Sequence, residues 1–319
     1  MKIVFNTRSL FEDNQQEKYF LYELLKRIII KYQEHEFIII TDRAHAKSYL
    51  FGKNVTTVIA RQQVSHPLLR KLWFDFKLPV ILKKHKADIF VSCDFFCSMT
   101  SQLPQCLLLD DFTFFYNTPF IKRLNLFFYK RYVPKFLTKA NTIISVSKSF
   151  KRDLSLRYKE QEDKIDVIYT AVKEIFLPVD EREKEQTKRK YSKEKNYFLY
   201  TGFIHSYKSL TSLLKAFSVF KKRQKSNWKF VLTGNIERES KSFTENLKTY
   251  KYREDIILTG FVKEEDLVKL VGSAYALVYP FQWDRIGTGM LEAINCRIPV
   301  IASANPSIKE IAEIGRAHV

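Results

Sequence analysis

Acidic side chains and glycines lie between two apolar stretches near the end of the sequence. Residues 275–279 are predicted to form a buried strand, and residues 299–302 a second one. The segment between them has a polar loop followed by a helical pattern. A glycine backbone lets a phosphate approach closely, and a helix N-terminus points free N–H groups at an anion. The pattern predicts a βαβ unit with an anion site, and a tight turn without a ligand is the alternative. The candidate residues are Asp284, Gly287, Thr288, Gly289 and Glu292.

A second candidate group follows another apolar stretch. Residues 197–201 are predicted to form a strand that ends at Gly202, and Lys208 comes shortly before a stretch with helical spacing. A lysine ammonium beside a helix entrance suits a diphosphate. We therefore expect Gly202 and Lys208 to contact a phosphorylated ligand.

Two adjacent acids, Asp110 and Asp111, end the apolar stretch at 105–109. Open α/β sheets place ligands beyond the carboxyl ends of their strands, so this pair is a candidate for chemistry. Capping of the following turn is an equally open interpretation. A single Asp-Asp pair is weak evidence for a metal ion, and we predict no metal site.

Apolar stretches of strand length recur along the whole chain and alternate with helical patterns. This alternation predicts parallel sheets with crossover helices, as in Rossmann-like domains. The expected strands, besides those named above, are residues 2–5, 37–40, 55–59, 89–92, 106–109, 142–146, 165–169, 228–233 and 256–259. A helix is expected at 19–30, after a loop that includes residues 14–18.

The length of 319 residues exceeds the roughly 100–200 residues of a usual single domain, so two domains are expected. Residues 179–196 are polar and highly charged, and we interpret them as a linker. The predicted domains are then residues 1–178 and 197–313.

Composition narrows the class of protein. A hydrophobic content of 45% supports globular cores, and no apolar run approaches the roughly 20 residues that span a bilayer. No signal peptide is recognisable, so we expect a cytoplasmic protein. The cysteines are too few and wrongly spaced for a zinc site or a disulfide framework, and we expect them to be small core residues.

The net charge of +19 predicts an anionic partner. Two stretches, 66–86 and 120–139, combine basic with aromatic and aliphatic residues. Such segments can lie on an anionic membrane, or their apolar side chains can belong to the core with the lysines facing water. Both interpretations stay open. Nucleic acid is disfavoured because no RNA- or DNA-binding motif accompanies the charge.

The order and spacing of these segments resemble the family 4 retaining glycosyltransferases of the GT-B fold, over essentially the whole chain. Asp284 and Glu292 stand at the two positions of the family's Glu-x7-Glu signature, and Cys296 and residues 299–301 match the strand entry that follows. The resemblance implies that Glu292 holds the hydroxyls of a nucleotide ribose and that Asp284 lies near the donor sugar. Its fold would be two Rossmann-like domains facing across a cleft.

The resemblance extends to the other candidates. Lys208 matches a lysine that contacts the donor diphosphate, and Asp111 matches an aspartate near the transferred sugar, with Asp110 in place of the family's histidine. The implied activity is hexose transfer from a nucleotide sugar to a glycan or lipid-linked acceptor, with retention of configuration, as in cell-surface polysaccharide synthesis. The nucleotide sugar is a substrate, so no cofactor is implied. Peripheral attachment to the inner face of the membrane is also implied.

Several departures from the family pattern support an alternative function. Residues 14–18 replace a glycine-rich turn, Tyr207 replaces an arginine, and Asp110 and Asp284 replace a histidine and a glutamate. The alternative is a catalytically degenerate homologue that binds a sugar nucleotide, membrane or partner without turnover.

The family pattern would continue beyond the last residue, so we expect the second domain to be incomplete. The peptide at 313–319 is what a sequencing-library adapter encodes, and we interpret residues 314–319 as an artificial tail.

Overall fold

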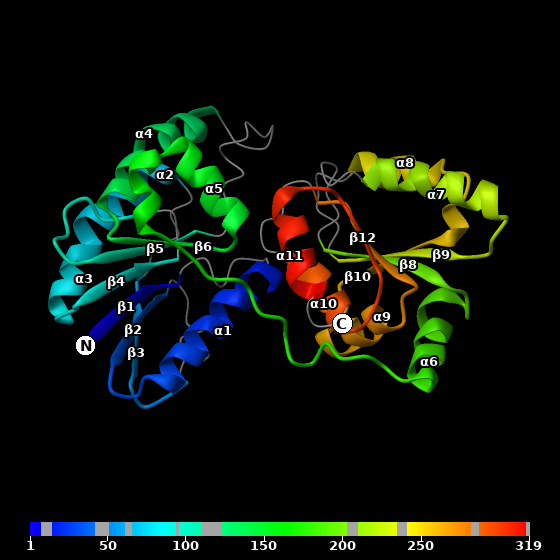
Figure 1. Cartoon of the computed structure of the whole chain (residues 1–319), viewed down its shortest axis with the longest axis horizontal. Coiled ribbons are helices and arrows are strands. Elements are labelled where there is room, and N and C mark those ends of the chain that lie inside the picture. Colours follow the sequence, from blue (N-terminus) through cyan, green and yellow to red (C-terminus); the bar gives the residue numbers. More distant parts are fainter. Residues whose placement is uncertain are drawn as a thin grey trace. The chain divides into compact units, whose positions relative to one another are not determined.

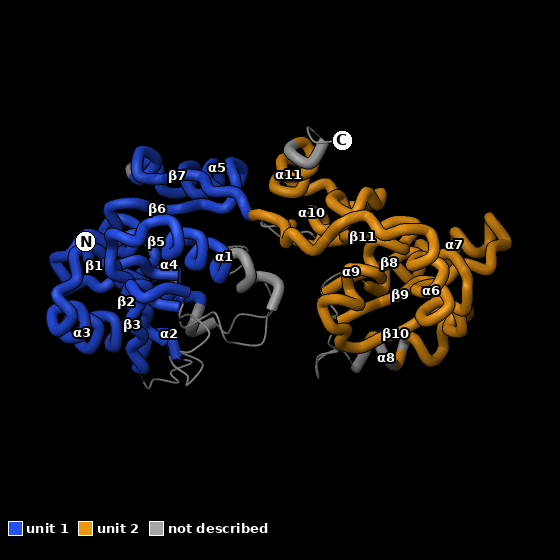
Figure 2. Tube along the Cα trace, turned by 90° about the horizontal axis from the view of Figure 1, so that it is seen from below, with its two compact units in different colours: residues 1–170 blue, residues 171–319 orange. Residues whose placement is uncertain are grey.

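The structure is a computed structural model of the chain. It describes residues 1–7, 15–41, 51–60, 66–93, 96–109, 123–202, 210–234, 241–281 and 287–316. The chain forms two compact units, Met1–Thr170 and Ala171–Val319, each with its own parallel sheet (Figure 2).

Unit 1 is built on a seven-stranded sheet in the order β3-β2-β1-β4-β5-β6-β7. All neighbouring strands in it are parallel. Its strands are β1 (Lys2–Asn6), β2 (Glu36–Thr41), β3 (Val55–Ile59), β4 (Ile89–Ser92), β5 (Gln105–Leu109), β6 (Thr142–Ser145) and β7 (Ile165–Val167). The chain moves outward from β1 to β3 and then returns to β4, so β1 and β4 flank a reversal of direction.

Helices cover both faces of this sheet, with α1 on one face and α4 and α5 on the other (Figure 1). The helical elements are α1 (Gln15–Lys31), α2 (Pro67–Leu72), the π-helix η3 (Trp73–Lys77), α3 (Leu78–Lys84), α4 (Arg123–Lys139), α5 (Lys148–Arg157) and the 3-10 helix η5 (Lys159–Lys164). Helix α1 begins four residues earlier than expected. Its first residues are glutamine, glutamate and lysine, which are good helix formers, so most of the expected loop at 14–18 is helical.

Unit 2 has a five-stranded parallel sheet in the order β10-β9-β8-β11-β12. Its strands are β8 (Tyr197–Thr201), β9 (Lys229–Thr233), β10 (Ile256–Gly260), β11 (Ala276–Tyr279) and β12 (Val300–Ala302). Its helical elements are α6 (Glu181–Ser192), α7 (Leu210–Gln224), α8 (Lys241–Lys248), η8 (Arg253–Asp255), α9 (Glu264–Gly272), α10 (Thr288–Asn295) and α11 (Pro306–Arg316). Helices α7 and α8 cover one face, and α9 and α10 the other (Figure 1). The predicted class, two Rossmann-like α/β domains, is confirmed.

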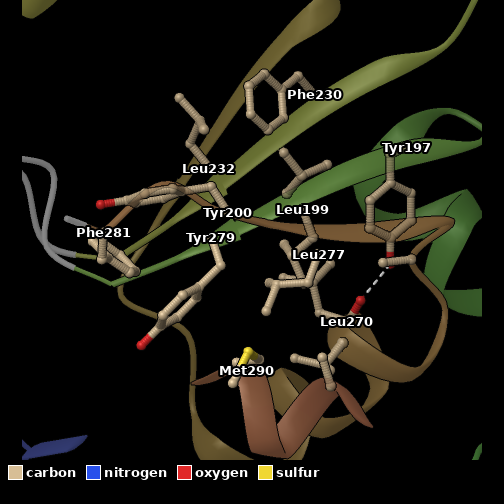
Figure 3. Close-up of a cluster of buried hydrophobic side chains, with 14 of the residues drawn as sticks. Tyr197, Leu199, Tyr200, Phe230, Leu232, Leu270, Leu277, Tyr279, Phe281 and Met290 are labelled. Atoms are coloured by element: carbon tan, nitrogen blue, oxygen red, sulfur yellow. Dashed lines mark hydrogen bonds between the residues drawn. The ribbon is translucent and has the colours of Figure 1, made fainter. Parts of the chain in front are cut away.

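The core of unit 2 contains several aromatic side chains along the sheet (Figure 3). Tyr197, at the start of β8, donates a hydrogen bond of 2.7 Å from its hydroxyl to the carbonyl of Leu270 in α9. At the other end of the strand, Tyr200, Tyr279 and Phe281 group together, with the Tyr279 and Phe281 rings 4.4 Å apart. These rings support the carboxyl end of the sheet.

The charged stretch at 179–196 is not an open linker. Residues 181–192 form α6, whose N-cap Asp180 accepts a 2.7 Å hydrogen bond from the Glu183 backbone. On the facing helix α9, Lys269 pairs with Glu183 at 2.9 Å. The charges that predicted a linker instead pair across two helices, and the two units divide between Thr170 and Ala171.

Two further expectations concern the cysteines and membrane-spanning segments. All four cysteines carry free thiols, and all but Cys106 are fully buried, as expected of small core residues. Within the described ranges, no helix is long and apolar enough to cross a membrane.

Candidate functional site

The carboxyl edge of the unit 2 sheet has a topological switch point between β8 and β11. The chain proceeds from β8 outward to β10 on one side, and from β11 to β12 on the other. Loops that leave such a pair of strands diverge, and the crevice between them is where open α/β sheets bind ligands. Gly202 follows β8, and the segment that leads to α10 follows β11.

Three of the strands at this edge end in a glycine with positive φ. The φ angles of Gly202, Gly234 and Gly260 are 124°, 134° and 68°. The N–H groups of Gly202 and Gly234 donate to the carbonyls of Thr233 and Gly260, each at 3.0 Å. A Cβ on Gly234 would lie 1.9 Å from the Gly202 carbonyl oxygen, so this position accepts no side chain. The edge therefore presents backbone rather than side chains to a ligand.

Helix α10 begins close against the same edge. Its N-cap, Gly287, has φ 64°, a left-handed conformation that glycine adopts at little cost. Two residues later, a Cβ on Gly289 would lie 3.1 Å from a ring carbon of Tyr279 and 3.2 Å from the Thr201 hydroxyl oxygen. The absence of this side chain lets the first turn of α10 pack on the ends of β8 and β11. The N-terminal end of α10, which favours an anion, therefore lies at the switch point.

The chain leaving β11 is held by hydrogen bonds to its carbonyl groups. The Phe281 carbonyl accepts from the Ser303 hydroxyl at 2.7 Å and from the Asn305 side-chain amide at 3.0 Å. Asn305 also accepts a 2.8 Å bond from the Ile308 backbone, which caps α11. One asparagine thereby joins the end of β11 to the start of α11.

Glu292 lies one turn into α10 and is 2% exposed. Its Oε2 atom has no hydrogen-bond partner among the described residues. Burial raises the pKa of this carboxyl to about 8, an effect that nearby Lys173 opposes and Glu264 reinforces. A buried acceptor without a partner is costly, so Glu292 is a candidate to bind a ligand group.

The segment entering unit 2 forms the surroundings of Glu292. Lys173 makes an ion pair with Glu264, the first residue of α9. The buried Phe176 follows, and its carbonyl accepts a 2.8 Å hydrogen bond from the side chain of Asn295 in α10. The segment from Lys173 to Phe176 is therefore attached to both α9 and α10.

The structure brings together one part of the predicted site. Gly202, Gly287, Thr288, Gly289 and Glu292 meet at the ends of β8 and β11 and in the first turns of α10. The other predicted residues, Asp110, Asp111, Lys208 and Asp284, lie outside the described residues.

Their flanking elements are nevertheless described. Asp110 and Asp111 directly follow β5, and Lys208 precedes α7 by two residues. Asp284 lies between Phe281 and Gly287. In sequence, each of these residues therefore lies between a described strand and the next described helix.

Two family models match this arrangement in sequence. Residues 20–174 match Glycosyltransferase Family 4, and residues 181–317 match Glycosyl transferases group 1. The chain belongs to these glycosyltransferases. The two matches correspond to unit 1 and unit 2 and together take in nearly the whole chain.

Curated relatives of this glycosyltransferase include enzymes of O-antigen synthesis. O-antigen chain mannosyltransferase RfbU of Salmonella typhimurium is 26% identical over 65% of this chain and 53% of its own length. O-antigen chain mannosyltransferase B of Escherichia coli is 25% identical over 55% of this chain and 46% of its own length. The chain thus spans about half the length of the curated relatives it matches.

Solved structures share the fold at low sequence identity. WaaG, a glycosyltransferase involved in lipopolysaccharide biosynthesis, has a TM-score of 0.73 at 14% identity, covering 98% of this chain and 84% of that one. Anabaena HepE in complex with UDP-glucose has a TM-score of 0.72 at 15% identity, covering 98% and 82%. The fold of this glycosyltransferase is therefore GT-B.

Sequence reasoning missed two features of the site in this GT-B protein. Gly234, directly after the expected strand at 228–233, was not among the predicted site residues, although a Cβ there would clash with the neighbouring strand end. Lys173 and Glu264 were not connected with Glu292 at all, because they are far from it in sequence. No local pattern in the sequence signals that approach.

Proposed function

We propose that this glycosyltransferase moves a hexose from a nucleotide-sugar donor, bound by unit 2, to a glycan or lipid-linked acceptor, with retention of configuration, in the synthesis of a cell-surface polysaccharide. The O-antigen mannosyltransferases among its relatives and the UDP-glucose complex of a protein with the same fold support this class of reaction. The nucleotide sugar is a substrate, and the proposal includes neither a cofactor nor a metal ion.

The observation that carries the proposal is the buried, unpartnered carboxylate oxygen of Glu292. Two adjacent hydroxyls of a ribose can both donate to one carboxylate, which would satisfy this oxygen. The position fits, because Glu292 lies one turn behind the glycines at the start of α10. A nucleotide whose ribose reaches Glu292 would have its phosphates near the first turn of that helix.

The chemistry proposed is stabilisation of a leaving group. Departure of the nucleoside diphosphate leaves negative charge on its oxygens, and the N-terminal end of α10, which begins at Thr288, would stabilise that charge. Lys208 would add a positive charge from the loop before α7. The acceptor would attack the same face of the sugar, with Asp284, Asp110 and Asp111 near the reacting groups.

The first experiment is a thermal-shift titration of the whole chain with UDP-, GDP- and ADP-sugars. A ligand that binds only the native state stabilises it by about 2.7 kcal/mol at one hundred times its Kd, so one donor class should raise Tm clearly. Glu292→Gln should abolish the shift, and Glu265→Gln, an acid at an exposed position of α9, should preserve it. No shift with any donor, from a sample that unfolds cooperatively, would contradict the proposal.

Turnover is measured separately. Transfer from the donor that binds, with NMR of the anomeric proton of the product, tests both catalysis and retention. A transfer product with inverted anomeric configuration would contradict retention but not the proposed glycosyl transfer. Donor binding without transfer to any acceptor would instead establish a catalytically degenerate homologue. The departures from the family pattern in the sequence are what support that alternative.

We also propose that the protein works in the cytoplasm at the inner face of the membrane. The proposed lipid-linked acceptor would lie in the membrane, so the proposed location follows from the proposed reaction. The location depends on the acceptor, and therefore on the same transfer experiments.

A further inference from the structure

Lys173 is more deeply buried than its ion pair explains. Its side chain is 15% exposed, although that of its partner Glu264 is 48% exposed. Lys190 and Lys269, which pair with acids between α6 and α9 of the same unit, are 57% and 46% exposed. Lysines are rarely buried unless they are paired, and a pair with a half-exposed acid contributes little to stability. The pair with Glu264 alone therefore does not account for the position of Lys173.

The chain on both sides of Lys173 is fixed to the core of unit 2. Val172 packs against that core, and Phe176 is fully buried in it. The Phe176 backbone N–H donates to the Lys173 carbonyl at 3.1 Å, which closes a turn. The Phe176 carbonyl accepts a 2.8 Å bond from Asn295, which lies less than one turn after Glu292 on α10. The backbone at Lys173 is thus attached to the part of α10 that contains Glu292.

The charges around Glu292 come from three elements. Lys173, in the segment that enters unit 2, lowers the pKa of this carboxyl, whereas burial and Glu264 of α9 raise it. Cys296, one turn later on α10, is a neutral thiol, because burial and the charge of Glu292 raise its pKa to about 12. Lys173 therefore supplies a positive charge that opposes the cost of burying an ionised Glu292.

The charge of Glu292 affects how well it binds a pair of hydroxyls. An ionised carboxylate accepts hydrogen bonds at both oxygens, whereas a protonated carboxyl uses one of its oxygens as a donor. Hydrogen bonds to an ionised acceptor are roughly twice as strong as bonds between neutral groups. Loss of one hydroxyl from a ligand is therefore felt more strongly when Glu292 is ionised.

We propose that Lys173 is a positioning residue that keeps Glu292 ionised for the ribose hydroxyls and thereby makes the site select a ribonucleotide over its 2′-deoxy counterpart. Lys173 acts through Glu292, without a contact of its own with the nucleotide. The inference rests on the proposed function, because it requires a nucleotide ribose at Glu292.

The experiment is calorimetric titration of the full chain at neutral pH with UDP, GDP and ADP, each compared with its 2′-deoxy counterpart. The unmodified chain should bind a ribonucleotide about tenfold to a hundredfold more tightly than the deoxynucleotide, because one hydrogen bond to a charged group is lost. In Lys173→Met this ratio of affinities should fall to about its square root, since neutral hydrogen bonds are roughly half as strong.

Matched variants separate charge from packing. Lys173→Arg keeps the positive charge and should keep the ratio. Lys269→Met removes a lysine that pairs with Glu183 at 2.9 Å on the same unit, and it should also keep the ratio. Raising the pH to about 9 should move the ratio of Lys173→Met back toward that of the unmodified chain, because Glu292 then ionises without the lysine. A purely structural defect would not be reversed in this way. Circular dichroism and Tm show that each variant is folded.

The results that overturn the inference differ from those that contradict the donor site. Equal losses of ribonucleotide and deoxynucleotide affinity in Lys173→Met would overturn the role of Lys173 in selectivity, as would an equal fall of the ratio in Lys269→Met. In both cases nucleotide binding by the unmodified chain would still support the donor site. Failure of every nucleotide to bind the folded, unmodified chain would contradict the donor site, and the role of Lys173 with it.

Discussion

Lys173 pairs with one carboxyl group of unit 2 and acts electrostatically on a second. It forms an ion pair with Glu264 at the start of α9, and its charge also acts on the buried Glu292 of α10. The lysine favours the ionised form of Glu292, whereas Glu264 and burial oppose it. The charge of Glu292, which is proposed to bind the ribose, therefore depends on Lys173, a residue of the segment that enters unit 2.

The buried carboxyl should make stability fall as pH rises. The Glu292 pKa is about 8 in the folded chain and 4.5 in its ordinary state. Between these values the folded state keeps a proton that the unfolded state has lost, so the free energy of unfolding falls by up to about 1.4 kcal/mol per pH unit. Below pH 4.5 and above pH 8 this contribution is constant. Urea denaturation from pH 5 to 9 should show a shallower decline in Glu292→Gln, and identical slopes would contradict the assignment.

Replacing Lys173 should change how nucleotide affinity depends on pH. Ribose hydroxyls donate to an ionised carboxylate, so affinity should rise with pH and level off above about pH 8. Lys173→Met removes a favourable charge and should move the midpoint upward, lowering affinity near pH 7 about tenfold, or 1.4 kcal/mol. Glu264→Gln should move it downward. Calorimetric titration at several pH values measures both.

A matched lysine provides the control for that series. Lys190 pairs at 3.1 Å with Asp266, which lies two residues beyond Glu264 on the same helix. Lys190→Met should leave the midpoint unchanged, because this pair is exposed and is not among the groups that act on Glu292. If both lysine variants moved the midpoint equally, the effect would be one of overall charge and not of position.

Two glycines at the carboxyl edge should differ in their tolerance of a methyl group. Gly234→Ala brings a Cβ to 1.9 Å from the Gly202 carbonyl and should destabilise unit 2 by about 3 kcal/mol or more. At Gly260 nothing lies within 4 Å, so Gly260→Ala should cost only the positive φ, about 1 kcal/mol. Urea denaturation of both variants tests the order, and equal losses would show that the contact is relieved by a backbone shift.

Asn305→Ala should loosen the start of the loop before α10. The change removes the bond to the Phe281 carbonyl and the cap on the Ile308 backbone, at a cost of about 1–2 kcal/mol. Nucleotide affinity should fall with stability, because the end of β11 and the start of α11 both belong to the unit whose α10 contains Glu292. Ser303→Ala removes only the bond to the Phe281 carbonyl, so its smaller effect serves as the comparison.

Local patterns were sufficient to predict most of the elements. Strands such as 37–40 and 256–259 are short apolar runs ended by polar or glycine residues, and these signals lie within a few neighbouring residues. Gly287, Gly289 and Glu292 belong to one strand-loop-helix segment, so their proximity follows from helix geometry alone. The predicted α/β class and the twofold division into sheets rested on the same local evidence.

Only the tertiary structure decided which distant groups meet. The charged stretch at 179–196 resembled a linker because its partners in α9 are far away in sequence: Asp266 lies 76 residues beyond Lys190, and Lys269 lies 86 residues beyond Glu183. The choice between core and exposed surface for Phe76 and Phe127 depended on a π-turn and on helix packing. The approach of Lys173 to Glu292 joins residues from different elements. Composition and periodicity predict the structure of one helix or strand at a time. Charge pairing and burial depend on how those elements pack against one another.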